Sequence, residues 1–184
     1  MNNNNNTLSI KTIISNSILL CVILFTSGCV SNVNIKSNST PDFSSKIKKL
    51  NIVTYLHNTG NQVFIKNMRE SLNKLSRSHG VEVLVQSING LEISQELEDI
   101  VKKANQYSDY LLTIKSVGGD KVNGKISKLK FNLAIIKKAV KQKPQAIIWR
   151  ANIDLALANF IDDKETSLTL SQAIYKRLQD DKVI

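Results

Sequence analysis

The chain has 184 residues, with 25 lysines and arginines against 15 acidic residues, so its formal net charge is +10. This length fits one domain that can bury a core without disulfides. The positive charge makes anionic partners plausible, whether lipid head groups, nucleic acid or an acidic cell-wall polymer. Specific nucleic-acid recognition is disfavoured because arginines, which form bidentate contacts with phosphate, are scarce; they are Arg69, Arg77, Arg150 and Arg177.

The N-terminal segment has the pattern of a secretory signal peptide. Its strongest apolar stretch covers residues 18–25, which is too short for a membrane-spanning helix of about 20 apolar residues. Lys11 is the only charged residue before it, and the small residues Thr26, Ser27 and Gly28 follow. A charged start, a short apolar stretch and small residues at its end predict a leader that is removed after export.

The segment Leu24-Phe25-Thr26-Ser27-Gly28-Cys29 resembles the lipobox of bacterial membrane lipoproteins that signal peptidase II processes, although Thr26 stands where that family usually has leucine. The resemblance implies cleavage before Cys29, a lipid on its sulfur, and acylation of the new amino terminus, for example by palmitate. Val30 fits the family habit for delivery to the outer membrane of a Gram-negative cell, facing the periplasm. The alternative is an ordinary signal peptide that ends near a cysteine.

The sequence therefore divides into three parts. We expect a lipoprotein signal peptide at 1–28, the lipidated Cys29 with a flexible tether at 29–45, and an α/β domain at 46–184. Residues 30–45 are rich in serine and asparagine and lack the apolar surface needed to order themselves. Cys21 lies in the leader, so the rest of the chain holds Cys29 alone and cannot form an internal disulfide.

Strands and helices alternate in the first half of the expected domain. Apolar, β-branched runs predict strands, and apolar residues at helical spacing predict helices. In chain order these are a strand at 50–56, a helix at 63–76, a strand at 81–85, a helix from Ser94 and a strand at 110–117. Gly80 suits the left-handed cap of the first helix. Gly118-Gly119-Asp120 and Asn123-Gly124 predict the turn after the third strand.

The second half carries the clearest strand signal. Apolar and polar residues alternate over 129–135 and again over 147–155, which predicts an antiparallel pair joined by residues 137–145. A last helix follows, with Leu170, Ile174 and Leu178 on its buried stripe. The expected fold is a two-layer α/β (α+β) domain, with a mixed sheet of about five strands and about three helices, mostly on one face.

A second resemblance covers the end of the chain. Residues 148–154 and the later core positions are similar to the end of small α/β envelope lipoproteins of the curli-secretion and penicillin-binding-protein-activator kind; these positions are Leu170, Ile174, Leu178, Asp181 and Ile184. The resemblance implies an α/β fold and an envelope setting. It supplies no catalytic residue.

The sequence lacks recognisable catalytic motifs. His57 and His79 each stand alone, and neither zinc-ligand spacing, a phosphate-binding glycine loop nor a G-x-S-x-G motif is present. We therefore expect no enzymatic activity, no catalytic residue, no metal and no cofactor. His57 follows a strand, where α/β folds often place ligands, so an enzymatic alternative would need a cleft around it.

Lysines are concentrated in residues 121–143, a stretch without aspartate or glutamate. The candidate contacts with an anionic surface are Lys125, Lys128, Lys130, Lys137 and Lys138. Near an anionic membrane each basic residue contributes about 1 kcal/mol. The alternatives are a solvated sheet face, or an edge strand that lysines protect against aggregation.

Together these features predict a lipid-anchored cell-envelope lipoprotein that acts as a non-enzymatic accessory module and binds another envelope protein. The alternative function is a binding module for anionic lipid or cell-wall polymer through the lysine-rich sheet face. The lipid on Cys29 would place either module on a membrane of the envelope.

Overall fold

The computed structural model describes residues 32–40, 43, 46–56, 62–88, 94–123, 125–139, 144–157 and 163–184. These ranges contain the strands β1 (Val33–Ser39), β2 (Lys49–Tyr55), β3 (Glu82–Ile88), β4 (Tyr110–Val122), β5 (Lys125–Lys137) and β6 (Ala146–Ala156). They also contain the helices α2 (Gln62–Ser78), α3 (Ser94–Tyr107) and α4 (Asp163–Asp180). None of the helices in these ranges is long and apolar enough to span a membrane.

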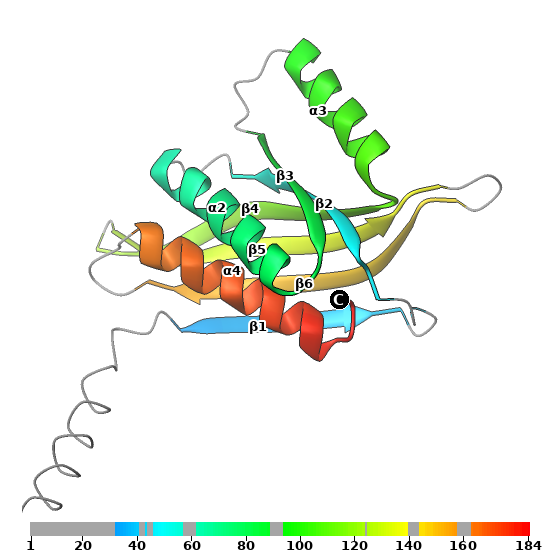
Figure 1. Ribbon diagram of the computed structural model, residues 1–184. Coiled ribbons are helices and arrows are strands. Elements are labelled where there is room, and N and C mark those ends of the chain that lie inside the picture. The colour runs from blue at the N-terminus through cyan, green and yellow to red at the C-terminus, as the bar shows by residue number, and fades with distance from the viewer. Residues whose placement is uncertain are drawn as a thin grey trace, which may run out of the picture. The chain divides into compact units, whose positions relative to one another are not determined.

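The strands form one mixed sheet in the order β1-β6-β5-β4-β2-β3 (Figure 1). β2 pairs in parallel with β3 and with β4, because α2 and α3 return the chain across the sheet between these strands. β4, β5 and β6 pair antiparallel in succession, and β1 pairs antiparallel with β6. The predicted mixed α/β fold is confirmed, with six strands in the sheet instead of about five.

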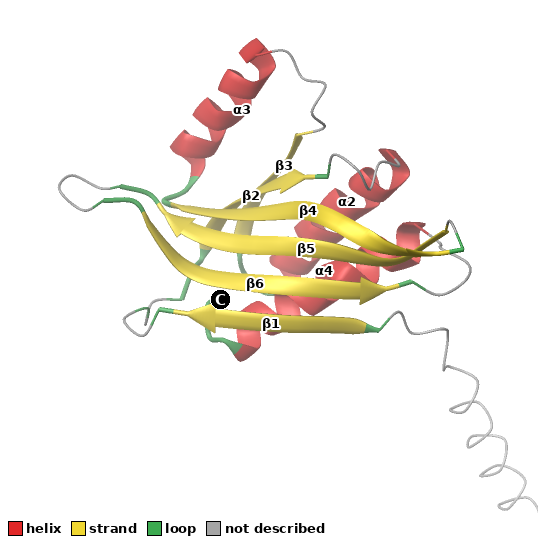
Figure 2. Cartoon of the chain, turned by 180° about the vertical axis from the view of Figure 1, so that it is seen from behind, coloured by secondary structure: helices red, strands yellow, loops and turns green. Residues whose placement is uncertain are grey.

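α2 and α4 cover one face of the sheet and lie behind it in Figure 2. The connections from β2 to β3 and from β3 to β4 run in opposite directions across the sheet, so two right-handed crossovers place α2 and α3 on opposite faces. Gln86 Nε2 donates a hydrogen bond to the Ile100 carbonyl oxygen at 3.3 Å, which ties α3 to β3. The second face over β1, β6, β5 and β4 carries no helix among the described residues.

The main core lies between the sheet and the pair α2 and α4. The predicted alternation is confirmed over 129–135 and 149–155, because every second side chain points to the helices and is buried; these are Leu129, Phe131, Leu133, Ile135, Trp149, Ala151, Ile153 and Leu155. It is wrong at Ile147, which is 38% exposed, because the strand register shifts between Ile135 and Ile136. The predicted stripe of α4 is also confirmed, since Leu170, Ile174 and Leu178 are fully buried. The polar residues between them face away from the helices.

The predicted tether at 29–45 is wrong for residues 33–39, which form the edge strand β1. Val33 and Ile35 are half-buried against the core, while Asn34, Lys36 and Asn38 are exposed on the other face. An edge strand with one wet face needs apolar residues at only every second position. Backbone hydrogen bonds to β6 hold the remaining positions of this segment in the sheet. The folded domain therefore begins near Val33 and not at residue 46.

The glycine pair at 118–119 does not form the predicted turn. It lies inside β4, which continues to Val122 with register irregularities on either side of the pair. Gly118 has a φ of 118°, a conformation that favours glycine. A Cβ on Gly119 would lie 2.3 Å from the backbone oxygen of Lys128. The glycines therefore permit a close strand approach inside a long hairpin.

The predicted cap at Gly80 is confirmed. Gly80 has a φ of 67°, and the backbone N–H of Val81 donates to the Ser76 carbonyl oxygen at 3.0 Å. This is the left-handed ending that glycine allows at a helix C-terminus. It terminates α2 and directs the chain into β3.

Candidate functional site

Two residues that the sequence singled out, Cys29 and His57, lie outside the described residues. The other histidine, His79, lies at the end of α2. Its Nδ1 is 2.7 Å from the Leu75 carbonyl oxygen, and its ring stacks on Tyr175 with centroids 5.7 Å apart. Burial raises the pKa of Tyr175, so its hydroxyl stays protonated and bonds to the Ser76 hydroxyl. His79 thus belongs to the contact between α2 and α4.

Two of the five candidate lysines share one carboxylate. The Lys130 Nζ lies 2.7 Å from Asp120 Oδ1, and the Lys128 Nζ lies 3.7 Å from Asp120 Oδ2. The hydrogen bond from Lys130 is the main reason that the pKa of Asp120 falls below its usual value. The same hydrogen bond raises the pKa of Lys130. The charge of this pair of lysines is therefore partly compensated within the sheet.

The lysines at the other end of β5 have different roles. The Lys138 ammonium donates hydrogen bonds to the carbonyl oxygens of Ala104 (2.7 Å) and Ser108, and so caps the C-terminus of α3. Burial lowers the pKa of Lys138. Lys137 Nζ lies 5.9 Å from the centroid of the Tyr110 ring. Lys138 is thus engaged in holding α3.

The five lysines therefore do not gather into one patch. From Lys128 to Lys137, β5 covers about 30 Å at about 3.4 Å per residue. Lys125 begins β5 beyond Lys128, and its side chain is not among those described. The sequence predicted that Lys128 and Lys130 share the exposed face of one strand and that the other lysines flank its ends, but not that three of the five make contacts within the domain.

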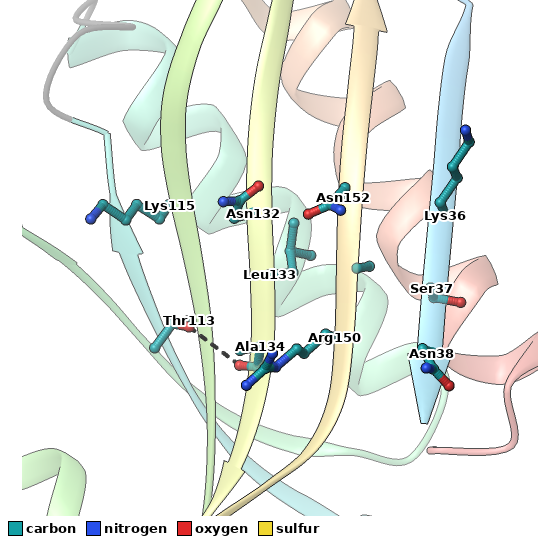
Figure 3. A pocket seen from close by; sticks show the side chains of 11 residues that line it. Lys36, Ser37, Asn38, Thr113, Lys115, Asn132, Leu133, Ala134, Arg150 and Asn152 are labelled. Carbon is teal, nitrogen blue, oxygen red and sulfur yellow. Dashed lines mark hydrogen bonds between the residues drawn. The ribbon is translucent and has the colours of Figure 1, made fainter. Parts of the chain in front are cut away.

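A different basic surface lies on the open face of the sheet (Figure 3). It is a shallow hollow of about 610 Å³ across β1, β6, β5 and β4. The side chains on its open-face positions are Lys36, Asn38, Thr113, Lys115, Asn132, Ala134, Arg150 and Asn152, and we call this set the sheet hollow. Thr113 Oγ1 donates to the Ala134 carbonyl oxygen at 3.3 Å. In Figure 3 the side chain of Arg150 extends towards Ala134.

Strand register explains how the sheet hollow is assembled. One rung of the sheet aligns Lys36, Asn152, Asn132 and Lys115 across the four strands. The next rung aligns Asn38, Arg150, Ala134 and Thr113. Neighbouring strands are about 4.8 Å apart, so the two lysines that end the first rung stand about 14 Å apart with two amides between them.

The sheet hollow is basic. Lys36, Lys115 and Arg150 are exposed, and its lining contains no carboxylate. The described residues give these three cations no ion pair. Asp154 is on the adjacent rung, where it pairs in register with Lys130. Hydrogen-bonding amides between unpaired cations suit a partner that presents carboxylates or phosphates.

Sequence reasoning missed the sheet hollow, although it placed Asn132, Arg150 and Asn152 on wet strand positions. The alternation along each strand shows which side chains face water, but the strand order that brings them together is a property of the fold. Lys36 and Asn38 were also assigned to a tether. Among the described residues, no group of three or more histidine, cysteine, aspartate or glutamate side chains could hold a metal ion.

No protein-family model matches this chain, and a search of curated proteins found no match. Its fold is similar to that of the PelC dodecamer subunit from Paraburkholderia phytofirmans, with 15% identity, 80% of this chain and 98% of that chain covered, and a TM-score of 0.48. A DUF4136 family protein from Bacteroides thetaiotaomicron matches at 7% identity, 84% and 98% coverage, and a TM-score of 0.40. Protein XCC0632 from Xanthomonas campestris, of family DUF330, matches at 8% identity, 83% and 91% coverage, and a TM-score of 0.35.

Proposed function

We propose that this protein is a lipid-anchored accessory protein of the bacterial cell envelope. It acts by binding and not by catalysis, and the sheet hollow is its partner-binding face. The observation that carries the proposal is the segment Leu24–Cys29, in which small residues and a cysteine end a short apolar leader. Each buried methylene of a lipid contributes about 0.8 kcal/mol, and more than one chain is needed for stable anchoring. A lipid on the sulfur and one on the new amino terminus would meet this requirement.

Replacing Cys29 with alanine is expected to abolish the processed, lipid-bearing form, because the thiol is the group that would receive the lipid. The measurement is partition between the aqueous and detergent phases of Triton X-114, with processing followed by gel mobility. Globomycin, which inhibits signal peptidase II, is expected to cause the longer precursor to accumulate in the unaltered protein.

The matched control is Cys21→Ala, which removes the other cysteine of the chain. This variant is expected to be processed and to enter the detergent phase like the unaltered protein. The proposal fails if Cys29→Ala yields the same processed, detergent-phase form.

The partner that suits the sheet hollow is an envelope component with an acidic surface, because the lining offers three cations and no carboxylate. The alternative of an anionic-surface site at the five β5 lysines has less support from the described contacts. Lys128 and Lys130 share Asp120, and Lys138 caps α3. These three side chains already have partners within the domain.

Reversing two charges of the sheet hollow, in the double variant Lys115→Glu/Arg150→Glu, is expected to weaken partner binding about tenfold or more, since each lost surface pair costs up to about 1 kcal/mol and each reversal adds repulsion. A photo-crosslinking residue at exposed Asn132 would report the contact in cells. The control Lys66→Glu/Lys74→Glu makes the same charge change on the exposed side of α2. Equal crosslinking in the two double variants would contradict this assignment of the binding face.

A further inference from the structure

The closed end of the β4–β5 hairpin projects beyond the rest of the sheet. Leu155 of β6 pairs with Val33 of β1 and with Leu129 of β5, so these three residues share a rung. From Leu129 back to the start of β5 at Lys125, four residues extend the hairpin about 14 Å beyond that rung at about 3.4 Å each, and β6 accompanies it as far as Leu157, whose N–H donates to the Ser127 carbonyl oxygen. Figures 1 and 2 both show this end on the side where β1 begins.

Apolar side chains are exposed on the projecting part. On this part Val122 is 59% exposed and Ile126 39%, and these are two of the six exposed large apolar side chains among the described residues; a third, Val117 at 47%, lies on the sheet side of the Leu129 rung. A single exposed apolar residue is ordinary. Val122 and Ile126 lie on neighbouring rungs at the closed end, so a bilayer that surrounds this end would cover both side chains.

Lysines are frequent in the sequence of this hairpin. Between Val117 and Lys130 the chain carries four lysines and one carboxylate, Asp120; Lys128 and Lys130 share this carboxylate, and Lys121 is exposed near the closed end, so the hairpin keeps a net positive charge. Such basic residues are attracted to a surface of anionic lipid. Apolar side chains mixed with lysines are typical of segments that rest in the interfacial region of a bilayer.

The length of chain between Cys29 and β1 fixes where a lipid could hold the domain. Only four Cα–Cα steps separate Cys29 from Val33, and an extended chain spans at most about 3.6 Å per residue, or about 14 Å in all. A lipid on Cys29 would therefore keep the rung of Val33 within about 14 Å of the membrane. The hairpin extends by the same distance from this rung.

From these distances we propose that the hairpin tip, formed by Lys121, Val122 and Ile126, is a second membrane contact that enters the head-group region of an anionic bilayer. The lipid of Cys29 attaches the domain, and the hairpin tip fixes its orientation, with the strand axes directed towards the membrane. This inference rests on the proposed anchoring, and it adds a site on the folded domain that contacts the same lipid surface.

The test uses the mature lipoprotein reconstituted in vesicles, with Val122→Cys carrying an environment-sensitive fluorophore. With Cys29 lipidated and Cys21 removed with the leader, the introduced thiol is the only free one. The matched control is Ile147→Cys, because Ile147 is also an exposed β-branched residue but pairs with Ile136 at the opposite end of the sheet. We expect the label at 122 to shift to shorter wavelength and to be quenched by nitroxide-bearing lipid, and the label at 147 to remain accessible to aqueous iodide.

Equal iodide quenching at positions 122 and 147 would overturn the inference. A blue shift at 122 in the mature chain without its lipid, in buffer that contains neither vesicles nor detergent, would also overturn it, since the tip would then contact a second copy of the chain. Flotation of the labelled lipoprotein with the vesicles separates the two proposals: protein that does not float refutes the anchor, and protein that floats with a solvent-exposed tip refutes only the hairpin contact.

Lipid composition provides a second measurement. Lipid quenching at 122 is expected to be stronger on vesicles that contain phosphatidylglycerol than on phosphatidylcholine alone, and to decrease as salt screens the lysines. Quenching that is independent of lipid charge and of salt would show that the lysines do not attract the hairpin tip to anionic lipid.

Discussion

Replacing Trp149 with alanine is expected to lower the free energy of unfolding by about 3–5 kcal/mol, the range for truncating a buried aromatic side chain. Trp149 is 1% exposed and lies in the core between β6 and the helices. Its Nε1 also donates a hydrogen bond to Asp181 Oδ2 at 2.8 Å. The substitution therefore leaves a large cavity and removes a donor from a partly buried carboxylate.

Urea unfolding followed by far-ultraviolet circular dichroism would measure the Trp149 effect, because Trp149 is the single tryptophan and its fluorescence is lost with it. The control is Ile147→Ala on the same strand, where the side chain is 38% exposed. We expect the control to lower the free energy of unfolding by less than about 1 kcal/mol, since little apolar area is buried at this position. Similar losses in the two variants would contradict the assignment of Trp149 to the core.

The second large effect is expected at Asp181, which joins three elements of the fold. Asp181 Oδ2 accepts hydrogen bonds from Ser37 Oγ of β1 at 2.5 Å, from Trp149 Nε1 of β6 at 2.8 Å and from Arg177 Nε of α4 at 3.2 Å. Asp181→Asn is expected to cost about 1.5–3 kcal/mol at pH 7, the range for hydrogen bonds to a charged group. The loss reflects a weaker attachment of β1 to α4.

The contribution of Asp181 depends on pH. Burial raises its pKa, but the hydrogen bonds from Ser37 and Trp149 and the charge of Arg177 outweigh burial, so the pKa lies below its usual value. A depressed carboxylate pKa stabilises the fold above the unfolded-state pKa of about 3.9, and this stability is lost as the pH falls through the folded-state pKa. The loss in free energy of unfolding caused by Asp181→Asn should therefore be smaller at pH 3 than at pH 7.

Urea midpoints of the two proteins at pH 7 and pH 3 would test this dependence. The control is Asp120→Asn, which removes an exposed carboxylate paired with Lys128 and Lys130. Because exposed ion pairs contribute little, this control should change the midpoint at pH 7 only slightly. An equal loss for Asp181→Asn at both pH values would contradict the role given to its charge.

Much of the fold followed from the sequence because local patterns determined it. The alternation around Phe131 and Ile153, the helical stripe of α4 and the cap at Gly80 each reflect contacts made within one element. The edge strand β1 was missed because its order comes from pairing with β6, more than a hundred residues away in the chain. Its serines and asparagines resemble a linker when considered alone.

The candidate surfaces were harder to predict because they depend on strand order and register. Lys36, Lys115 and Arg150 come from three strands that are distant in sequence, and only the order β1-β6-β5-β4 places them on one face. The glycine pair at 118–119 suggested a turn, so the hairpin was expected to end earlier. Its true length, up to Val122, is what projects apolar side chains beyond the sheet.

The most direct test of the central claim is the intact mass of the protein purified from bacterial membranes. The account predicts a polypeptide that begins at Cys29 and carries the additional mass of a thioether-linked diacylglycerol and an amide-linked acyl chain. A chain that retains residues 1–28, or one that begins at residue 29 with an unmodified cysteine, would contradict it.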